Sequence, residues 1–164
     1  MTRTISIAPV RKSIVVQAGS ALAFEIFTSQ VGTWWPKSHS MGGLPFRRSM
    51  IEPFVGGRWY AERQDGSEVN IAHVVVWEPS RRVVFRWEIG QGYKPEPDEA
   101  SELEVRFVSL GSDSTRVDLE HRDFGRVSGD GDAYRNGLDR GWPVALDQFA
   151  AACQCKVSVS DSRN

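Results

Sequence analysis

Residues 101–124 read SELEVRFVSLGSDSTRVDLEHRDF, and this stretch decides the fold that we expect. On both sides of the tetrapeptide GSDS, apolar residues alternate one by one with charged residues. A two-residue period places the apolar side chains of a strand on one face, and GSDS is typical of a turn. The stretch therefore predicts two antiparallel strands with one apolar face and one charged face. The inward-facing residues are Leu103, Val105, Phe107, Val117, Leu119 and His121.

Further segments with strand character precede this pair. The segments MIEPF, GRWYAERQ, EVNIAHVVVWE and RRVVFRWEI lie between residues 49 and 89, and VRKSIVVQ occupies residues 10–17. Together with the first pair they predict seven strands. In EVNIAHVVVWE, alternation puts His73 on the inner face. The other inward residues of these segments are Ile71, Val75, Trp77, Val83, Phe85, Trp87 and Ile89.

Helical spacing appears in two parts of the chain. Residues 131–154 carry an apolar stripe that recurs every three to four residues, and Pro143 inside it predicts a kink or the effective start of the helix. Ser20 is expected to cap a short helix at 21–29, and a second short helical turn carries the tryptophan pair. The stripe consists of Tyr134, Leu138, Trp142, Leu146, Phe149 and Cys153.

These elements predict one architecture. A single amphipathic helix must bury its stripe, and the apolar face of the sheet is the available partner. We therefore expect an α+β fold of the helix-grip type, with a curved antiparallel sheet of about seven strands wrapped on a long C-terminal helix and two short helices after the first strand. One domain is expected over residues 1–155, and a disordered polar tail over residues 156–164.

Composition argues against several classes of partner. The formal net charge is -1, with 20 basic and 21 acidic residues interspersed, so we expect no nucleic-acid partner. We also expect no membrane association and a cytoplasmic location, because no apolar run reaches a spanning length and the N-terminus lacks a signal-peptide pattern.

Metal-ligand and phosphate-binding motifs are absent from the sequence, so no metal or cofactor is expected. We expect a structural role for Cys153 and Cys155. The acidic residues Glu102, Glu104, Asp118 and Glu120 are expected to lie on the solvated face of the sheet and not in a catalytic site.

Several stretches in register carry a family resemblance. They are AFEIFTSQVGTWWP, HSMGG, VGGRWYAERQDGSE, VVVWEPSRRVVFRW, EVRF, TRVDLEHRDF and DRGWPVALDQFAA, and they span about residues 15 to 150. With them the chain resembles the SRPBCC, or START-like, helix-grip superfamily of START domains, polyketide cyclases and birch-pollen-allergen-like proteins. More narrowly, it resembles bacterial proteins similar to the activator of the Hsp90 ATPase.

This resemblance implies an internal cavity, because family members include ligand binders and cyclases. Two positions depart from the family pattern, since Asp123 stands where glycine is common and Ala72 lies where a small residue, often glycine, is usual. We do not expect a co-chaperone role, because the eukaryotic co-chaperone adds a separate N-terminal domain.

The predicted function is the binding of a small hydrophobic or aromatic molecule between the sheet and the C-terminal helix. Aromatic side chains suit an apolar site with a few polar anchors, although tryptophan is also a common core residue. His73 and His121 are the expected anchors, and His39 is expected in a mobile lid formed by GTWWPKSHSMGG at 32–43. The predicted walls are Trp34, Trp35, Trp59, Phe85, Trp87, Tyr134, Leu138 and Trp142.

Two alternatives remain open at this point. The first is a cyclase- or hydrolase-like enzyme that acts on a polyketide or aromatic substrate with His121 or His73 as its base. The second is a protein-interaction module, such as a homodimer, with an exposed apolar patch. No complete catalytic constellation appears in the sequence, so binding is favoured over catalysis.

Overall fold

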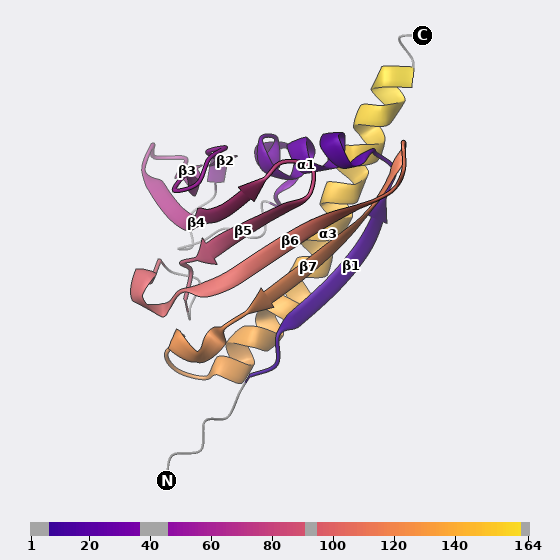
Figure 1. Cartoon of the computed structure of the whole chain (residues 1–164). Coiled ribbons are helices and arrows are strands. Elements are labelled where there is room, and N and C mark those ends of the chain that lie inside the picture. Colours follow the sequence, from indigo (N-terminus) through magenta and orange to yellow (C-terminus); the bar gives the residue numbers. More distant parts are fainter. Residues whose placement is uncertain (1–6, 37–45, 91–94, 162–164) are drawn as a thin grey trace.

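The computed structural model describes residues 7–36, 46–90 and 95–161, with side chains as far as Cys155. His39 and most of the predicted lid lie outside these ranges. Seven strands form one antiparallel sheet in the order β1-β7-β6-β5-β4-β3-β2, as the alternation predicts (Figure 1). The strands are β1 (Val10–Val16), β2 (Phe46–Ile51), β3 (Arg58–Arg63), β4 (Glu68–Glu78), β5 (Arg82–Trp87), β6 (Ser101–Gly111) and β7 (Ser114–Arg122).

The helices lie where the sequence predicts them. α1 (Ser20–Thr28) and α2 (Val31–Trp34) follow β1, and the long α3 (Gly131–Asp161) ends the described chain. Ser20 is the first residue of α1 and not its cap, because the N-cap position is Gly19 and no side chain caps the helix. Two short 3-10 helices, η1 (Pro97–Glu99) and η2 (Phe124–Arg126), were not predicted.

α3 crosses the inner face of the curled sheet, as expected for a helix-grip fold (Figure 1). The predicted inward residues of β5, β6 and β7 are all buried, and all except the polar His121 belong to one hydrophobic core with the α3 stripe. Pro143 lies inside α3 and does not mark its start. The helix also continues to Asp161, so the predicted domain boundary at residue 155 falls within it. Within the described residues, no helix is long and apolar enough to cross a membrane.

The prediction that His73 lies on the inner face of the sheet is wrong, and two β-bulges in β4 explain why. Trp59 pairs with Ala72 while Tyr60 pairs with Asn70, so β4 has one extra residue there. A second extra residue, Val75, follows before β4 resumes its pairing with β5. Each extra residue moves the following side chains to the opposite face.

Between the two bulges, the faces of β4 are therefore the reverse of the predicted ones. His73 lies on the outer face, opposite Arg86 of β5, with its Nδ1 2.8 Å from Glu88 Oε2. Its side chain is 35% exposed. Val75, which was also predicted to face inward, is 47% exposed. After the second bulge Trp77 is again on the inner face, where its ring contacts Phe24.

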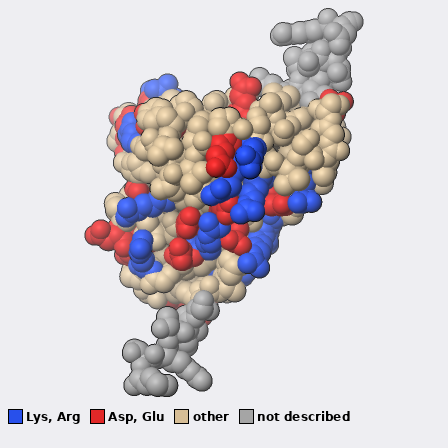
Figure 2. Space-filling model, in the orientation of Figure 1, with Lys and Arg blue, Asp and Glu red and all other residues tan. Residues whose placement is uncertain are grey.

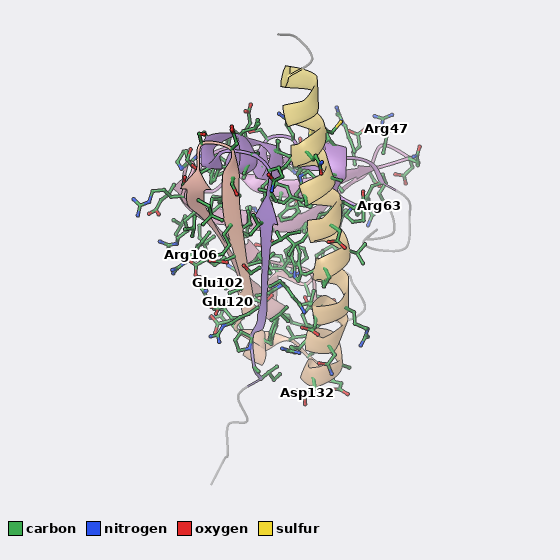
Figure 3. All side chains as sticks on the ribbon, turned by 90° about the vertical axis from the view of Figure 1, so that its right-hand side faces the viewer. Arg47, Arg63, Glu102, Arg106, Glu120 and Asp132 are labelled. Carbon is green, nitrogen blue, oxygen red and sulfur yellow. The ribbon has the colours of Figure 1, made fainter. Side chains whose placement is uncertain are left out.

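The outer face of the sheet carries paired charges. Figure 2 shows Lys and Arg side chains interspersed with Asp and Glu side chains across this face, and Figure 3 shows Glu102, Arg106 and Glu120 on the side of the sheet away from α3. Glu104 is also on this face but is buried, because arginines from three strands cover it. The outer face is thus a network of ion pairs more than a set of solvated side chains.

Candidate functional site

The inner side of the sheet and α3 enclose what we call the aromatic cluster. It comes from four parts of the fold, namely α2 with its C-cap residue, β3, β5 and α3, and every member is buried. Strand alternation and helical spacing bring these rings together, because each element turns its apolar face inward. The cluster consists of Trp34, Trp35, Trp59, Phe85, Trp87 and Trp142.

Trp35 lies at the centre of the aromatic cluster. Its ring centroid is 5.0 Å from that of Trp59, 5.8 Å from that of Trp142 and 6.4 Å from that of Trp87. It also contacts its neighbour Trp34 at 5.8 Å in an edge-on arrangement. These separations are typical of favourable aromatic pairs. The tryptophan pair of the sequence therefore belongs to one packed group, with Trp34 nearer α1 and Trp35 nearer the sheet.

His121 on β7 is the polar residue next to this cluster. It is fully buried, and its ring centroid is 5.4 Å from that of Trp87. The indole N–H of Trp142 lies 3.1 Å from His121 Nδ1, and Ser101 Oγ lies 2.7 Å from His121 Nε2. An indole N–H can only donate, so Nδ1 is the acceptor and Nε2 of the neutral imidazole carries the proton. Nε2 therefore donates to the Ser101 hydroxyl.

Burial lowers the pKa of His121 from its usual value to about 3. The imidazole is consequently uncharged near neutral pH. Its Nδ1 lone pair is already occupied by Trp142, and a group with so low a pKa is a weak base. The arrangement suits a fixed hydrogen-bonding residue better than a residue that gains and loses a proton during a reaction.

The indole N–H groups of the cluster are not equally satisfied. Trp34 donates to the carbonyl oxygen of Ile26 at 2.8 Å, and Trp59 donates to Ser49 Oγ at 3.2 Å. In contrast, the indole N–H of Trp87 has no acceptor among the described residues, and this side chain is only 2% exposed. A buried donor without an acceptor costs about 1–3 kcal/mol. Trp87 is therefore an energetically unfavourable feature of an otherwise well-packed cluster.

The two remaining predicted wall residues lie further along α3. Tyr134 is buried, donates its hydroxyl to the carbonyl oxygen of Ile89 and contacts the ring of Phe124. Leu138 is also buried, one turn before Trp142 on the same helix. These residues extend the apolar surface of α3 from the aromatic cluster toward the N-terminal end of the helix.

The structure adds two residues that the sequence analysis missed. Ser101 has the same strand phase as Leu103, so the alternation could have placed it on the inner face beside His121. Phe124 is the first residue of η2, and its ring centroid lies 5.2 Å from that of His121. No periodic pattern in the sequence marks this turn. The preceding residue, Asp123, has a positive φ of 65°, a left-handed conformation in which glycine is unstrained.

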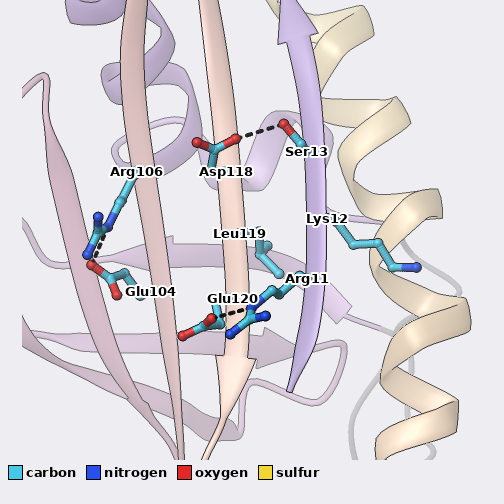
Figure 4. Close-up of a pocket in the computed structure, with 8 residues that line it drawn as sticks. All are labelled: Arg11, Lys12, Ser13, Glu104, Arg106, Asp118, Leu119 and Glu120. Atoms are coloured by element: carbon cyan, nitrogen blue, oxygen red, sulfur yellow. Dashed lines mark hydrogen bonds and ion pairs between the residues drawn. The ribbon is translucent and has the colours of Figure 1, made fainter. Parts of the chain in front are cut away.

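The described residues contain no group of three or more His, Cys, Asp or Glu that could hold a metal ion. A hollow of about 450 Å³ lies on the outer face of β1, β6 and β7 (Figure 4). Its charged side chains all have ion-pair partners, as in the bond from Arg11 Nε to Glu120 Oε1 at 2.7 Å and that from Arg106 Nε to Glu104 Oε2 at 2.8 Å. Such a self-paired surface does not suit an apolar molecule.

Comparison with known proteins gives a consistent result. The model of the family described as Activator of Hsp90 ATPase homolog 1-like protein matches residues 18–154. The solved structure of Txn09, an anthrahydroquino-gamma-pyrone synthase, is 39% identical over 89% of this chain and 97% of its own, with a TM-score of 0.64. CalC from Micromonospora echinospora, a self-sacrificing resistance protein, is 30% identical over 90% of this chain and 95% of its own, with a TM-score of 0.68.

A more distant structure, MLL2253 from Mesorhizobium loti, is 15% identical over 88% of this chain and 95% of its own, with a TM-score of 0.63, and shows the fold alone. A search of curated proteins gave no match. The family match covers most of the chain, and its relatives share the sheet wrapped on a C-terminal helix. The chain therefore belongs to the Activator of Hsp90 ATPase homolog 1-like family, within the helix-grip superfamily that also contains polyketide cyclase-like proteins.

Proposed function

We propose that this protein binds a planar, polycyclic aromatic molecule of the polyketide type between the sheet and α3. The observation that carries the proposal is the aromatic cluster, in which Trp35 contacts Trp59, Trp87 and Trp142. Binding sites for small molecules are mostly apolar and aromatic, with few polar groups. The identity of 39% with Txn09, whose name refers to a fused aromatic product, supports this class of ligand.

The geometry favours entry of the ligand beside Trp35. This residue is the most exposed member of the cluster, at 8%, and it lies at the end of a helix of only four residues. Movement of its ring would uncover the faces of Trp59, Trp87 and Trp142 together. Each contact between aromatic rings contributes about 0.5–1.5 kcal/mol beyond the burial of apolar area. A ligand of several fused rings can replace the contacts that Trp35 gives up.

The test is a titration of the full chain with the dihydroxyanthraquinone danthron, followed by the ¹⁵N–¹H signals of the indole groups. We expect saturable shifts in the signals of the buried tryptophans and no shift for Trp77, which contacts Phe24 outside the cluster. The Trp77→Phe variant assigns the Trp77 signal and should bind with unchanged affinity. The proposal fails if no indole signal shifts at any soluble concentration, or if only the Trp77 signal shifts.

A second candidate function is ring closure of such a molecule, which the 39% identity with a synthase favours. In a γ-pyrone closure, a phenolic oxygen attacks the distal ketone carbon of a 1,3-diketone side chain attached at the ortho position, and one water leaves. The chain would hold the reacting groups together in a water-poor site. His73 takes no part in this candidate because it lies on the outer face, and His121 would act as a neutral hydrogen-bonding group.

The assay for ring closure uses an ortho-hydroxynaphthyl diketone. The conversion to the fused pyrone is followed by absorbance, with and without protein. An unchanged rate in the presence of the protein, together with binding of danthron, would leave binding as the function and exclude this reaction.

A further inference from the structure

We propose that the indole N–H of Trp87 donates a hydrogen bond to a carbonyl oxygen of the bound molecule, so that the ligands are aromatic ketones and quinones. This inference rests on the proposed binding function and assigns Trp87 the role of a specificity-determining residue. The inference begins from a difference among the indole N–H groups in whether the protein provides a hydrogen-bond acceptor. Trp34, Trp59 and Trp142 each donate to a protein acceptor, whereas Trp87 has none among the described residues.

The surroundings of Trp87 explain why the protein itself does not satisfy this donor. The nearest polar ring is that of His121, at 5.4 Å between centroids. Its Nδ1 lone pair already accepts from Trp142, and its Nε2 carries the proton that is donated to Ser101. His121 therefore has no acceptor left for Trp87. Burial also keeps bulk water away from the indole.

The other neighbours of Trp87 define the shape of the molecule that could supply the acceptor. The ring centroids of Trp59, Trp142 and Trp35 lie 5.5, 5.7 and 6.4 Å from that of Trp87. An acceptor that reaches this position must therefore be carried on a flat apolar framework. A carbonyl oxygen attached directly to a fused ring system meets this requirement.

The charge of the site favours a neutral acceptor. The aromatic cluster contains no charged side chain, and His121 beside it is uncharged. A buried carboxylate without a cationic partner would lose its hydration without compensation. A ketone or quinone oxygen accepts one N–H bond at a much lower cost of desolvation. The site should therefore distinguish ligands by a carbonyl group and not by a negative charge.

The experiment compares fluorenone with fluorene, which have the same three fused rings and differ in one carbonyl oxygen. Fluorene is the more apolar molecule, so it should bind more tightly to a purely apolar site. We expect the wild-type protein to bind fluorenone about 3- to 10-fold more tightly than fluorene, which corresponds to one net hydrogen bond. In Trp87→Phe we expect the ratio of the two affinities to fall to one or to reverse, because phenylalanine keeps an aromatic ring at this position but has no N–H to donate.

Two further measurements keep the test decisive. Trp77→Phe serves as the matched control, since it also replaces one indole and should keep the preference for fluorenone. In the wild type, the ¹⁵N–¹H signal that is missing in Trp87→Phe should move downfield with fluorenone and not with fluorene. This second readout remains informative if Trp87→Phe fails to fold, because the signal can then be assigned by its contacts to neighbouring rings.

The failure of this inference differs from the failure of the proposed function. If both compounds bind and the wild type prefers fluorene, Trp87 is not the anchor, but aromatic binding stands. If Trp87→Phe keeps the preference for fluorenone, another group supplies the hydrogen bond and the inference is wrong. If neither compound nor danthron binds, the proposed function itself is wrong.

Discussion

At the scale of single residues, His121 has the environment with the clearest consequences. It links α3 to the sheet through Trp142 and Ser101, and burial keeps its imidazole neutral. Alternation correctly placed it on the inner face, because β7 pairs with β6 without a bulge from Arg122 to Thr115. Alternation could have placed Ser101 on the inner face of β6 beside His121. The bond from Trp142 could not be predicted from the sequence, since it depends on how α3 is set against the sheet.

The pKa of His121 makes a testable prediction about stability and pH. In the unfolded chain the imidazole binds a proton near pH 6.5, whereas in the folded protein it does so only near pH 3. The unfolded state therefore gains protons first, and stability is lost as the pH falls below about 6.5. Between pH 7 and pH 5 we expect His121 to account for a loss of about 2 kcal/mol in the free energy of unfolding.

Urea unfolding of the wild type and of His121→Gln at the two pH values measures this loss. His121→Gln should be less sensitive to acid by about the same 2 kcal/mol. Trp77→Phe is the control, because it replaces a residue without a titratable group that contacts Phe24 away from His121. Equal acid sensitivity of the wild type and His121→Gln would contradict the assigned environment.

At the scale of elements, the position of α2 depends on a close approach between backbones. A Cβ atom built on Gly32 would lie 2.7 Å from the carbonyl oxygen of Ser49 on β2. Only glycine therefore allows α2 to approach this strand, and α2 with its C-cap residue carries the tryptophan pair of the cluster. The sequence motif predicted the helical turn correctly, but it contained no information about the strand that the turn contacts.

The substitution Gly32→Ala tests this contact. We expect it to lower the free energy of unfolding by about 1–3 kcal/mol, because the backbone of α2 must shift away from β2. It should also shift the indole signals of Trp34 and Trp35. Gly125→Ala is the matched control, since a Cβ at Gly125 meets nothing within 4 Å. The two variants should differ clearly in thermal unfolding, and equal stabilities would argue against the close packing.

Strand β4 marks the limit of prediction from periodicity. Its two bulges cancel, so Ile71 in the first bulge and Trp77 after the second are on the inner side as alternation predicts. His73 between the bulges and Val75 in the second bulge are not. A bulge changes the pairing of one strand with its neighbours, but no fixed sequence pattern identifies its position. The sheet, its order of elements and most of its inner face could thus be predicted, but the middle of β4 could not.

At the scale of the whole molecule, the two faces of the sheet are stabilised in different ways. The inner face packs rings and aliphatic side chains, whereas the outer face depends on ion pairs. Glu104 and Glu120 lie directly opposite each other on β6 and β7, a placement that is unfavourable without a cation between them. Arg122 bridges them, with Nη1 2.7 Å from an oxygen of each carboxylate.

Arg122 is therefore expected to be the most important cation of the outer face. Burial lowers the pKa of its guanidinium, but hydrogen bonds to Glu104, Glu120 and Glu102 outweigh this effect and the pKa is raised. We expect Arg122→Ala to lower the free energy of unfolding by about 1–3 kcal/mol in dilute buffer, because it leaves the buried Glu104 short of one partner. In about 1 M salt the loss should be smaller, since the Debye length falls to about 3 Å.

Chemical unfolding at both salt concentrations provides the measurement. Arg116→Ala is the matched control, because the Arg116–Asp118 pair is well exposed and such pairs contribute only about 0–1 kcal/mol. An Arg122→Ala variant as stable as Arg116→Ala would show that the remaining arginines suffice for Glu104.

The bond from Trp142 to His121 also constrains how α3 can rotate about its own axis. Contacts between aliphatic side chains tolerate small changes in the rotational setting of a helix, because many such settings bury similar apolar area. A shift of α3 by one residue would turn Trp142 by about 100°. The indole donor and the His121 acceptor would then both be buried without partners, at about 1–3 kcal/mol each. One buried hydrogen bond, between a helix and a strand that share an apolar interface, thus selects a single orientation of the longest element of the fold.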